Sequence, residues 1–306
     1  MLDLHTHSTF SDGSDTPTQL AEKAHHLGIS AIALTDHDTT LSYDEMSTAC
    51  SKLGLELVTG VEVSLRDTEF PRVRDGVTKA RNVHVLAYFL PLDAEHPIQK
   101  KLTSLRRDRD SRNHELVTLL QEKGFEDLTL AYLTEMTGNV DSIGRPHFAR
   151  AMIDLHPELV GEQNENTWNR IFTDWLGTEG AAYVSKTSMP VEEFVGAANG
   201  SGTVFSIAHP LVNYVDEVNP MSIEATMPRV MASLRERGFA GVEAHYGGTS
   251  AGIRALMVKL TRDAGMIPTG GSDYHGHYKG DVSLGVGKSG DLRVPDGILD
   301  ELKAAR

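Results

Sequence analysis

Cysteine and long hydrophobic runs are nearly absent from this sequence of 306 residues. The single cysteine, Cys50, cannot form a disulfide within the chain, which is typical of a reducing compartment. No stretch approaches the ~20 apolar residues of a membrane-spanning helix. The N-terminal residues, MLDLHTHSTF, lack the basic and apolar segments of a signal peptide. We therefore expect a cytoplasmic protein without a membrane span.

Positive charge is also in short supply. Lys and Arg number 29 against 43 Asp and Glu, which gives a formal net charge of −14. Broad binding along nucleic acid needs a positive field, so a coat of long nucleic acid is not expected. Hydrophobic residues make up 40% of the chain, enough for a buried core. The 14 histidines are unusual in such an acidic chain.

Short apolar and β-branched runs alternate with helical patterns along most of the chain. One predicted helix begins at Thr16 with Pro17 in its first turn and ends at Gly28. The alternation predicts an α/β fold and leaves open a closed parallel barrel or a doubly wound sheet. The predicted strands are residues 2–5, 31–35, 56–63, 83–89, 203–208, 241–244 and 267–270.

Residues 95–190 depart from this alternation. They contain no convincing strand, and their leucines recur at helical spacing, as at Leu102, Leu105 and Leu116. The stretch is too long for a simple crossover between strands. We therefore predict a barrel or sheet domain formed by residues 1–94 and 191–306, with residues 95–190 as an inserted helical subdomain.

The first helix of this insertion carries the densest basic run of the chain. Such a run is typical of a solvated helix face. The alternative is a basic rim above an anionic substrate, and the sequence leaves both open. The run consists of Lys100, Lys101, Arg106, Arg107, Arg109 and Arg112.

Histidines and carboxylates recur at or near the predicted strand ends. His5 and His7 close the first strand, where alternate residues point to the same side. The carboxyl ends of the strands are the face where α/β barrels build their active sites. Asp12 follows the first strand in the turn Ser11-Asp12-Gly13, which can bring its carboxylate back over the strand end. Residues that follow the same pattern on other strands are His37, Glu62, His84, His209, Asp273 and His275.

Such a convergence of imidazoles and carboxylates needs compensation, because buried polar groups and charges without partners are costly. Divalent cations provide it by accepting the lone pairs of these groups. The set suits about three metals with three or four protein ligands each, which leaves positions for water and substrate. We expect His25, His26, His96, His114 and His156, which lack such partners, to be surface residues.

These motifs resemble the polymerase-and-histidinol-phosphatase (PHP) family of metal-dependent phosphoesterases. The resemblance implies a distorted (β/α)7 TIM-like barrel with a trinuclear metal cluster, and the motifs span residues 3 to 275. They are Asp3-Leu4-His5-Thr6-His7-Ser8, Ser11-Asp12-Gly13, Thr35-Asp36-His37-Asp38, Gly60-Val61-Glu62, His84, Ala208-His209-Pro210 and Ser272-Asp273-Tyr274-His275.

The resemblance also implies a ligand set for three divalent metal ions. The first would lie on His5, His7, Glu62 and Asp273, the second on Glu62, His84 and His209, and the third on Asp12, His37 and His275. Sites of this composition accept Mn, Fe and Zn alike, so the sequence leaves the metal open.

Within the family, the insertion and the run Ser142–Ala149 resemble the branch that acts on nucleotides. Its members include nucleoside 3′,5′-bisphosphate phosphatases and 5′→3′ exoribonucleases that degrade short RNA. In that branch the insertion caps the barrel mouth and the Arg-Pro-His segment helps to bind phosphate. The resemblance therefore implies that Arg145 and His147 bind phosphate here. Alternatively, Arg145 and Pro146 simply begin a helix. His245 is a further candidate for contact with the substrate.

The resulting expectation is hydrolysis of phosphate monoesters such as adenosine 3′,5′-bisphosphate or AMP, or of the 5′ ends of short RNA. A metal-bound water would be the nucleophile. His209, His245 or an acidic residue outside the ligand set would protonate the leaving oxygen, and the sequence does not choose among them. Asp36 and Asp38 would orient imidazoles from outside the ligand set.

Three alternatives are kept. A histidinol-phosphate phosphatase would share the fold and the metals. A metal-dependent amidohydrolase commonly needs a bridging lysine at the end of strand four, where this chain has Ala87-Tyr88-Phe89. A noncatalytic, metal-stabilised module fits a complete ligand set poorly. The oligomeric state is left open.

Overall fold

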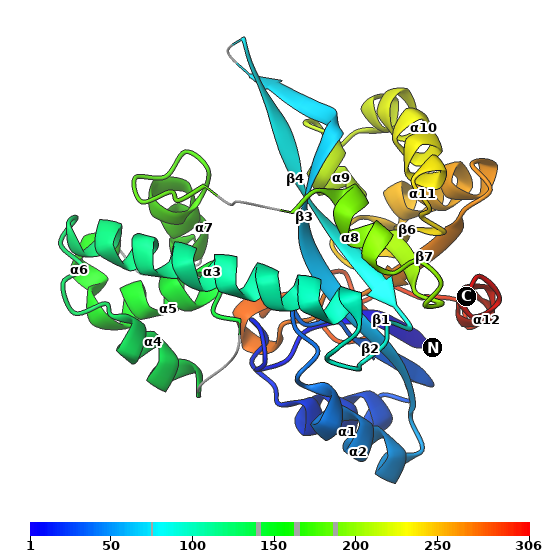
Figure 1. Cartoon of the computed structure of the whole chain (residues 1–306), viewed down its shortest axis with the longest axis horizontal. Coiled ribbons are helices and arrows are strands. Elements are labelled where there is room, and N and C mark those ends of the chain that lie inside the picture. The colour runs from blue at the N-terminus through cyan, green and yellow to red at the C-terminus, as the bar shows by residue number, and fades with distance from the viewer. Residues whose placement is uncertain (75, 139–141, 162–165, 186–188) are drawn as a thin grey trace.

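The computed structural model describes residues 1–74, 76–138, 142–161, 166–185 and 189–306. Within these residues, seven strands form one sheet in chain order. Hydrogen bonds from Asp273 N to His5 O and from His7 N to Tyr274 O, both 2.9 Å, join the last strand to the first. The sheet is thus a nearly closed, distorted α/β barrel, as predicted (Figure 1). The strands are β1 (Leu2–Thr6), β2 (Ala31–Leu34), β3 (Glu56–Arg74), β4 (Val77–Tyr88), β5 (Val204–Ile207), β6 (Gly241–Tyr246) and β7 (Ile267–Gly271).

Helices pack around the barrel, and the first of them lies where the sequence pattern predicted it. The first begins at Thr16, whose hydroxyl accepts from Gln19 N, and residue Gly28 beyond its end has φ 68°. The left-handed conformation at such a position favours glycine. These helices are α1 (Pro17–His26), α2 (Tyr43–Leu53), α8 (Val191–Ala197), α9 (Pro210–Tyr214), α10 (Pro220–Glu236), α11 (Ala251–Asp263) and α12 (Gly297–Ala304).

The expectation of an all-parallel barrel is wrong at β3 and β4. These two strands are longer than predicted and pair antiparallel with each other, and β4 also runs antiparallel to β5. A turn this short cannot return the chain for parallel pairing. Beyond Val63 the third strand continues through Arg66, Asp67 and Glu69, charges that hid its extent. The resulting β3–β4 hairpin projects beyond the barrel (Figure 1).

The helices between β4 and β5, apart from α8, form a second body beside the barrel (Figure 1). They enclose their own apolar cluster, which includes Phe125, Phe148 and Met152. The first half of α3 instead packs on the barrel core through Ile98 and Leu102. Helix α3 therefore connects the two bodies, and boundaries at residues 95 and 190 stay a prediction. The helices are α3 (Pro97–Gln121), α4 (Leu130–Thr137), α5 (Arg145–Leu155), α6 (Pro157–Val160), α7 (Thr167–Ile171) and the π-helical turn Phe172–Leu176.

In the part of the chain that is described, no helix combines the length and the apolar character that a membrane crossing requires.

Candidate metal centre

The predicted ligands meet around the carboxylate of Glu62. Its Oε2 lies 3.2 Å from His7 Nε2 and 3.2 Å from His37 Nδ1. Its Oε1 lies 2.9 Å from both His84 Nδ1 and His209 Nε2. One buried carboxylate thus links imidazoles from four separate segments of the chain.

Two aspartates complete the cluster on either side. Asp273 Oδ1 lies 3.5 Å from His5 Nε2 and 3.5 Å from His7 Nε2. Asp12 Oδ1 lies 3.3 Å from His275 Nε2. All nine predicted ligands are therefore brought together. His209 joins the cluster through Glu62 Oε1, and the ligand atoms of the other eight form three compact groups, namely His7, Asp12, His37 and His275; His5, His7 and Asp273; and His37, Glu62 and His84.

Several imidazole nitrogens in this cluster are buried with no hydrogen-bond partner among the described residues. They include His5 Nε2, His7 Nε2 and His37 Nδ1, which lie within 3.5 Å of carboxylate oxygens. A buried polar atom left without a partner is costly, and native proteins leave few of them. Nitrogen and oxygen donors in this arrangement fit divalent transition-metal ions.

The charges around the cluster keep its carboxylates ionised. Burial raises the pKa of Glu62, but His37, His84 and His5 outweigh it and hold this pKa well below its usual value. Burial lowers the pKa of His37 to about 3, although Asp12 and Glu62 oppose the shift.

Burial opposes the charged forms of His5 and His7, but neighbouring carboxylates outweigh it, so the pKa of His5 lies well above its usual value and that of His7 rises to about 9. Bound metals would displace these protons, because ionised carboxylates and neutral imidazoles are the forms that bind metals.

Glu243 is a functional residue that the sequence interpretation did not assign. Its Oε1 lies 2.7 Å from His5 Nδ1, and its Oε2 accepts a hydrogen bond of 2.6 Å from His209 N. A carboxylate behind a ligating imidazole fixes the ring and its tautomer. The signal was present in the sequence, because alternation along β6 places a carboxylate on the inner face at Glu243.

The hydrogen bonds of Asp36 and Asp38 differ from the prediction that both orient imidazoles. Asp36 accepts from Ser8 N at 2.8 Å and from Ser11 Oγ at 2.7 Å, which fixes the loop that carries Asp12. Asp38 accepts from Ser64 N at 2.9 Å and from the guanidinium of Arg109. Among the described residues, both carboxylates thus hold backbone and insertion rather than rings.

Arginines from the insertion cover the cluster. Arg106 donates to the backbone oxygen of Asp38 at 3.0 Å, and Arg109 is buried against the Asp38 carboxylate. Burial lowers the pKa of Arg112 to about 10. Together with residues of the cluster, these arginines enclose a small cavity of about 60 Å³. It is lined by Asp12, His37, Ser64, His84, Arg109, Arg112, Gly144, Arg145 and Pro146.

The basic run on α3 therefore fits both interpretations that the sequence left open, a rim above the cluster for some residues and a solvated helix face for others. Arg109 and Arg112 form a rim above the cluster, whereas Lys100 and Lys101 pair at the surface with Glu95 and Glu193. Helical periodicity separates these positions onto different faces.

Arg145 and His147 lie at the start of α5, next to this cavity. Arg145 lines it and donates to Leu176 O at 3.2 Å. His147 is buried, and its Nδ1 accepts from Gly144 N at 3.0 Å, so the ring caps the helix. Burial lowers the pKa of His147 to about 4, which favours the neutral ring that such a cap requires.

His245 is not brought to the cluster. Burial, Arg254 and Arg262 lower its pKa to about 4, and both arginines belong to α11 on the outer side of the barrel. The β6–β7 pairing shifts register between Glu243 and His245. Such a bulge reverses the alternation of side chains. Tyr246 takes the inner position instead and donates to Asp273 Oδ2 at 3.1 Å.

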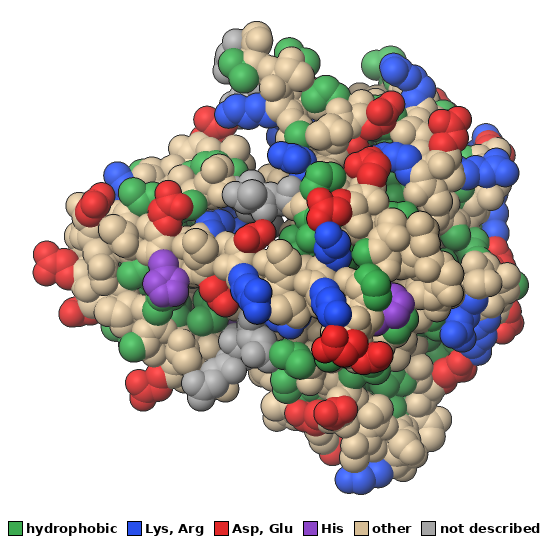
Figure 2. Space-filling model, viewed as in Figure 1, with side chains coloured by type: hydrophobic (Ala, Val, Ile, Leu, Met, Phe, Trp, Pro, Cys, Tyr) green, Lys and Arg blue, Asp and Glu red, His purple; other side chains and the backbone are tan. Residues whose placement is uncertain are grey.

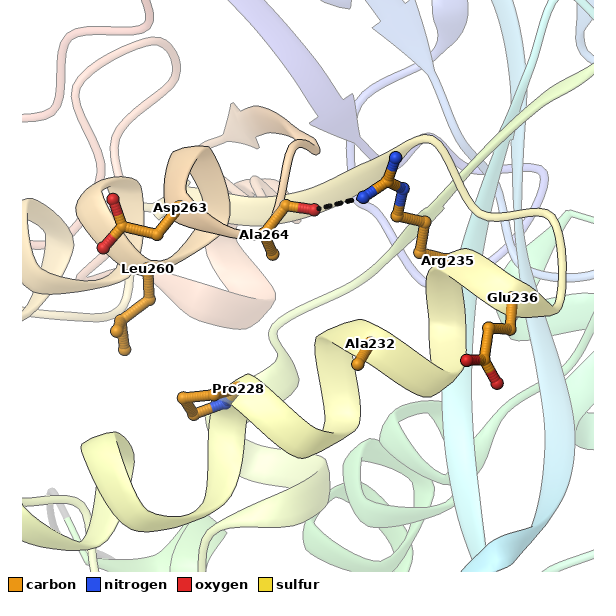
Figure 3. Close-up of a pocket in the computed structure, with 7 residues that line it drawn as sticks. All are labelled: Pro228, Ala232, Arg235, Glu236, Leu260, Asp263 and Ala264. Carbon is orange, nitrogen blue, oxygen red and sulfur yellow. Dashed lines mark hydrogen bonds between the residues drawn. The ribbon is translucent and has the colours of Figure 1, made fainter.

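Two further findings concern residues outside the cluster. His156, expected at the surface, is buried with its ring 5.5 Å from that of Phe125. A separate groove of about 740 Å³ lies between α10 and α11 (Figure 3), and none of the described residues that line it is a histidine. Its carboxylate Asp263 pairs with Lys259. The described lining of the groove thus offers two carboxylates, Glu236 and Asp263, but none of the imidazoles that the cluster has.

The sequence matches the family model "PHP domain" over residues 3–168. Relatives over nearly the whole chain include a 5′-3′ exoribonuclease of Haemophilus influenzae, 26% identical, with 89% of each chain covered. A 3′,5′-nucleoside bisphosphate phosphatase of Chromobacterium violaceum is 28% identical, with 93% of this chain and 90% of the relative covered.

Two solved structures share the fold. A protein of Bifidobacterium adolescentis, described as a metal-dependent phosphoesterase, is 27% identical with a TM-score of 0.75 over 99% of this chain and 96% of its own. A protein of Chromobacterium violaceum, described as an amidohydrolase with bound sulfate, is 26% identical with the same coverage and TM-score, 0.75.

Proposed function

Because this chain belongs to the PHP domain family and is a metal-dependent phosphoesterase, we propose that its substrates are phosphate monoesters of nucleotides. Adenosine 3′,5′-bisphosphate, AMP and the 5′ ends of short RNA are the members of this class to test first. The observation that carries the proposal is the position of Arg112 and Arg145 in the wall of the cavity above the ligand cluster. Guanidinium groups beside bound cations suit an anionic phosphoryl group.

We further propose that three divalent ions occupy the cluster, and that Mn, Fe or Zn fills these sites. His5, His7, Glu62 and Asp273 would hold the first, and Glu62, His84 and His209 the second. Asp12, His37 and His275 would hold the third. The short distances from both Glu62 oxygens to imidazoles on different segments support a bridging role for this carboxylate.

Bound divalent ions would supply Lewis acidity toward the phosphoryl oxygens and would lower the pKa of water toward neutrality. The residues of the chain would do the rest. Arg112 and Arg145 would bind the non-bridging oxygens of the phosphoryl group. Glu243 would hold the ring of His5 and the backbone of His209 in place. Phosphoryl transfer depends mainly on such positioning and charge stabilisation.

Of the two imidazoles considered for protonation of the leaving oxygen, only His209 lies at the cleft that opens outward from the cluster. The same ring is a proposed metal ligand and would be neutral, so we assign the proton donor to neither. His245 faces α11 and has no such access. We therefore propose no role for His245 in the reaction.

The function is tested by phosphate release from four compounds under one set of conditions. They are adenosine 3′,5′-bisphosphate, AMP, a 5′-phosphorylated dinucleotide and histidinol phosphate, each with Mn²⁺ and after chelation. The nucleotides should be hydrolysed faster than histidinol phosphate, and chelation should stop the reaction. Equal or faster turnover of histidinol phosphate would overturn the nucleotide assignment.

A further inference from the structure

A second cavity opens outward from the one above the cluster. The two share His84, Arg112 and Arg145 in their walls. The outer cleft measures about 680 Å³, whereas the inner cavity measures about 60 Å³. Ligand pockets of drug-sized molecules range from about 300 to 1,000 Å³. The inner cavity therefore has room for a phosphoryl group, and the outer cleft for the remainder of a nucleotide.

The walls of this outer cleft differ in chemistry. The insertion contributes Leu116, Leu176 and Tyr183, a surface with apolar and aromatic character. The projecting β3–β4 hairpin contributes Arg72, Lys79 and Arg81. Figure 2 shows Lys and Arg side chains on this hairpin above the insertion.

The cleft gathers positive charge in a chain whose formal net charge is −14. Its described lining holds Arg72, Lys79, Arg81, Arg112 and Arg145, and a single carboxylate, Glu179. A concave surface of one charge sign concentrates ligands of the opposite sign. The ligand in the cleft is therefore expected to carry a second negative charge, at a distance from the phosphoryl group at the cluster.

The cationic side chains of the hairpin differ in how strongly they are bonded to the rest of the protein. Arg81 donates to Phe70 O and to Asn213 O, both at 2.9 Å, so its guanidinium holds the hairpin base. Arg72 pairs with Asp216 at 3.0 Å in an ion pair whose side chains are 49% and 68% exposed. Lys79 is exposed. Exposed cations of this kind can exchange a weak partner for a phosphate.

We propose that the outer cleft binds the part of the nucleotide that does not react, and that Lys79 and Arg72 hold its second phosphate. The inference rests on the proposed function and specifies it, because it makes the hairpin the element that distinguishes a nucleoside bisphosphate from a monophosphate. The nucleoside lies along Leu176 and Tyr183, between the reacting phosphoryl group and the hairpin.

The test compares steady-state kinetics of adenosine 3′,5′-bisphosphate with those of 3′-AMP and 5′-AMP. The variants are Lys79→Gln, Arg72→Gln and the double substitution, and Lys52→Gln on α2 is the matched control because it removes an equally exposed cation. The double variant should raise KM for the bisphosphate by about tenfold or more, as expected for lost hydrogen bonds to a charged group. Its kcat should change far less, because a remote group contributes binding common to substrate and transition state.

The KM of the bisphosphate should also rise more steeply with salt than that of the monophosphates, and this difference should shrink in the double variant. Equal KM changes for bisphosphate and monophosphates would overturn the assignment of the cleft while leaving the proposed function intact. Failure of the unmodified protein to release phosphate from any nucleotide would overturn both.

Discussion

The barrel and the helical insertion contribute to one site in different ways. Barrel ligands such as His5 and Glu62 sit on strands or directly beside them, where backbone pairing fixes each side chain. The insertion contributes Arg112 and Arg145 from helices that pack around their own core. It is tied to the ligand loops by Arg106 and Arg109, which both contact Asp38. In the proposed function, the barrel would hold the metals, and the insertion would supply the arginines that bind the reacting phosphoryl group.

The largest effect should follow from substitution at the centre of the barrel cluster. Glu62→Gln removes the negative charge that the imidazoles around both carboxylate oxygens share. Bound metal should therefore decrease, and the rate of phosphate release should fall with it by more than about a hundredfold. Glu22→Gln on α1 is the control, because Glu22 is an exposed carboxylate. Metal analysis with parallel rate measurements checks this. Full metal content with full activity in Glu62→Gln would refute the shared ligand.

A smaller effect is expected behind the ligands. Glu243→Gln keeps the shape of the side chain but weakens its hold on His5 Nδ1, where the distance is 2.7 Å. Loss of such a partner typically costs about 10–100-fold in metal affinity. Titration of the metal-depleted variant with Mn²⁺, followed by activity, should show the shift, and excess Mn²⁺ should restore most of the rate. An unshifted titration would mean that Glu243 only fills space.

Substitution in the insertion should separate recognition from metal binding. Arg145→Ala should lower kcat/KM by about tenfold or more, the usual loss for a hydrogen bond to a charged group, with metal content unchanged. Arg107→Ala, an exposed arginine on α3, serves as the control. Metal loss in Arg145→Ala would show that the two bodies are not separable.

The smallest effect should appear in how the two bodies unfold. Both tryptophans, Trp168 and Trp175, lie in the insertion, and the only cysteine, Cys50, is buried in the barrel. Burial raises the pKa of the Cys50 thiol to about 11, so thiol labelling reports the opening of the barrel. Added Mn²⁺ should delay the labelling of Cys50 more than it shifts the tryptophan fluorescence transition. Equal shifts by both probes would indicate one cooperative unit.

The convergence of these side chains was predictable because several of them, such as His5 and His209, lie at or just beyond a strand end. His84 joins the cluster as expected, although it lies inside β4 and this strand runs opposite to the expected direction. It pairs in register with Ser64, so its ring meets the diagonal neighbour Glu62 on the same face. Two side chains on the same face of adjacent strands stay close whether the strands run parallel or antiparallel.

Other features depend on geometry that a sequence pattern does not contain. The shift in register between Glu243 and His245 exchanges His245 for Tyr246, and no residue type in that segment announces it. Lys279, which donates to Asp273 Oδ2 at 2.7 Å, comes from a short 3₁₀ turn beyond the last motif. The hairpin extension was hidden by charged residues, of which Arg66 and Glu69 are exposed whereas Asp67 is buried against Arg237 and Tyr214.

The most direct test of the central claim is the rate of phosphate release from adenosine 3′,5′-bisphosphate by chelated protein, before and after Mn²⁺ is returned. The cluster around Glu62 predicts that chelation abolishes the rate and that Mn²⁺ restores it in the unmodified protein but not in Glu62→Gln. A rate that survives chelation, or recovery by Glu62→Gln equal to that of the unmodified protein, would contradict the claim.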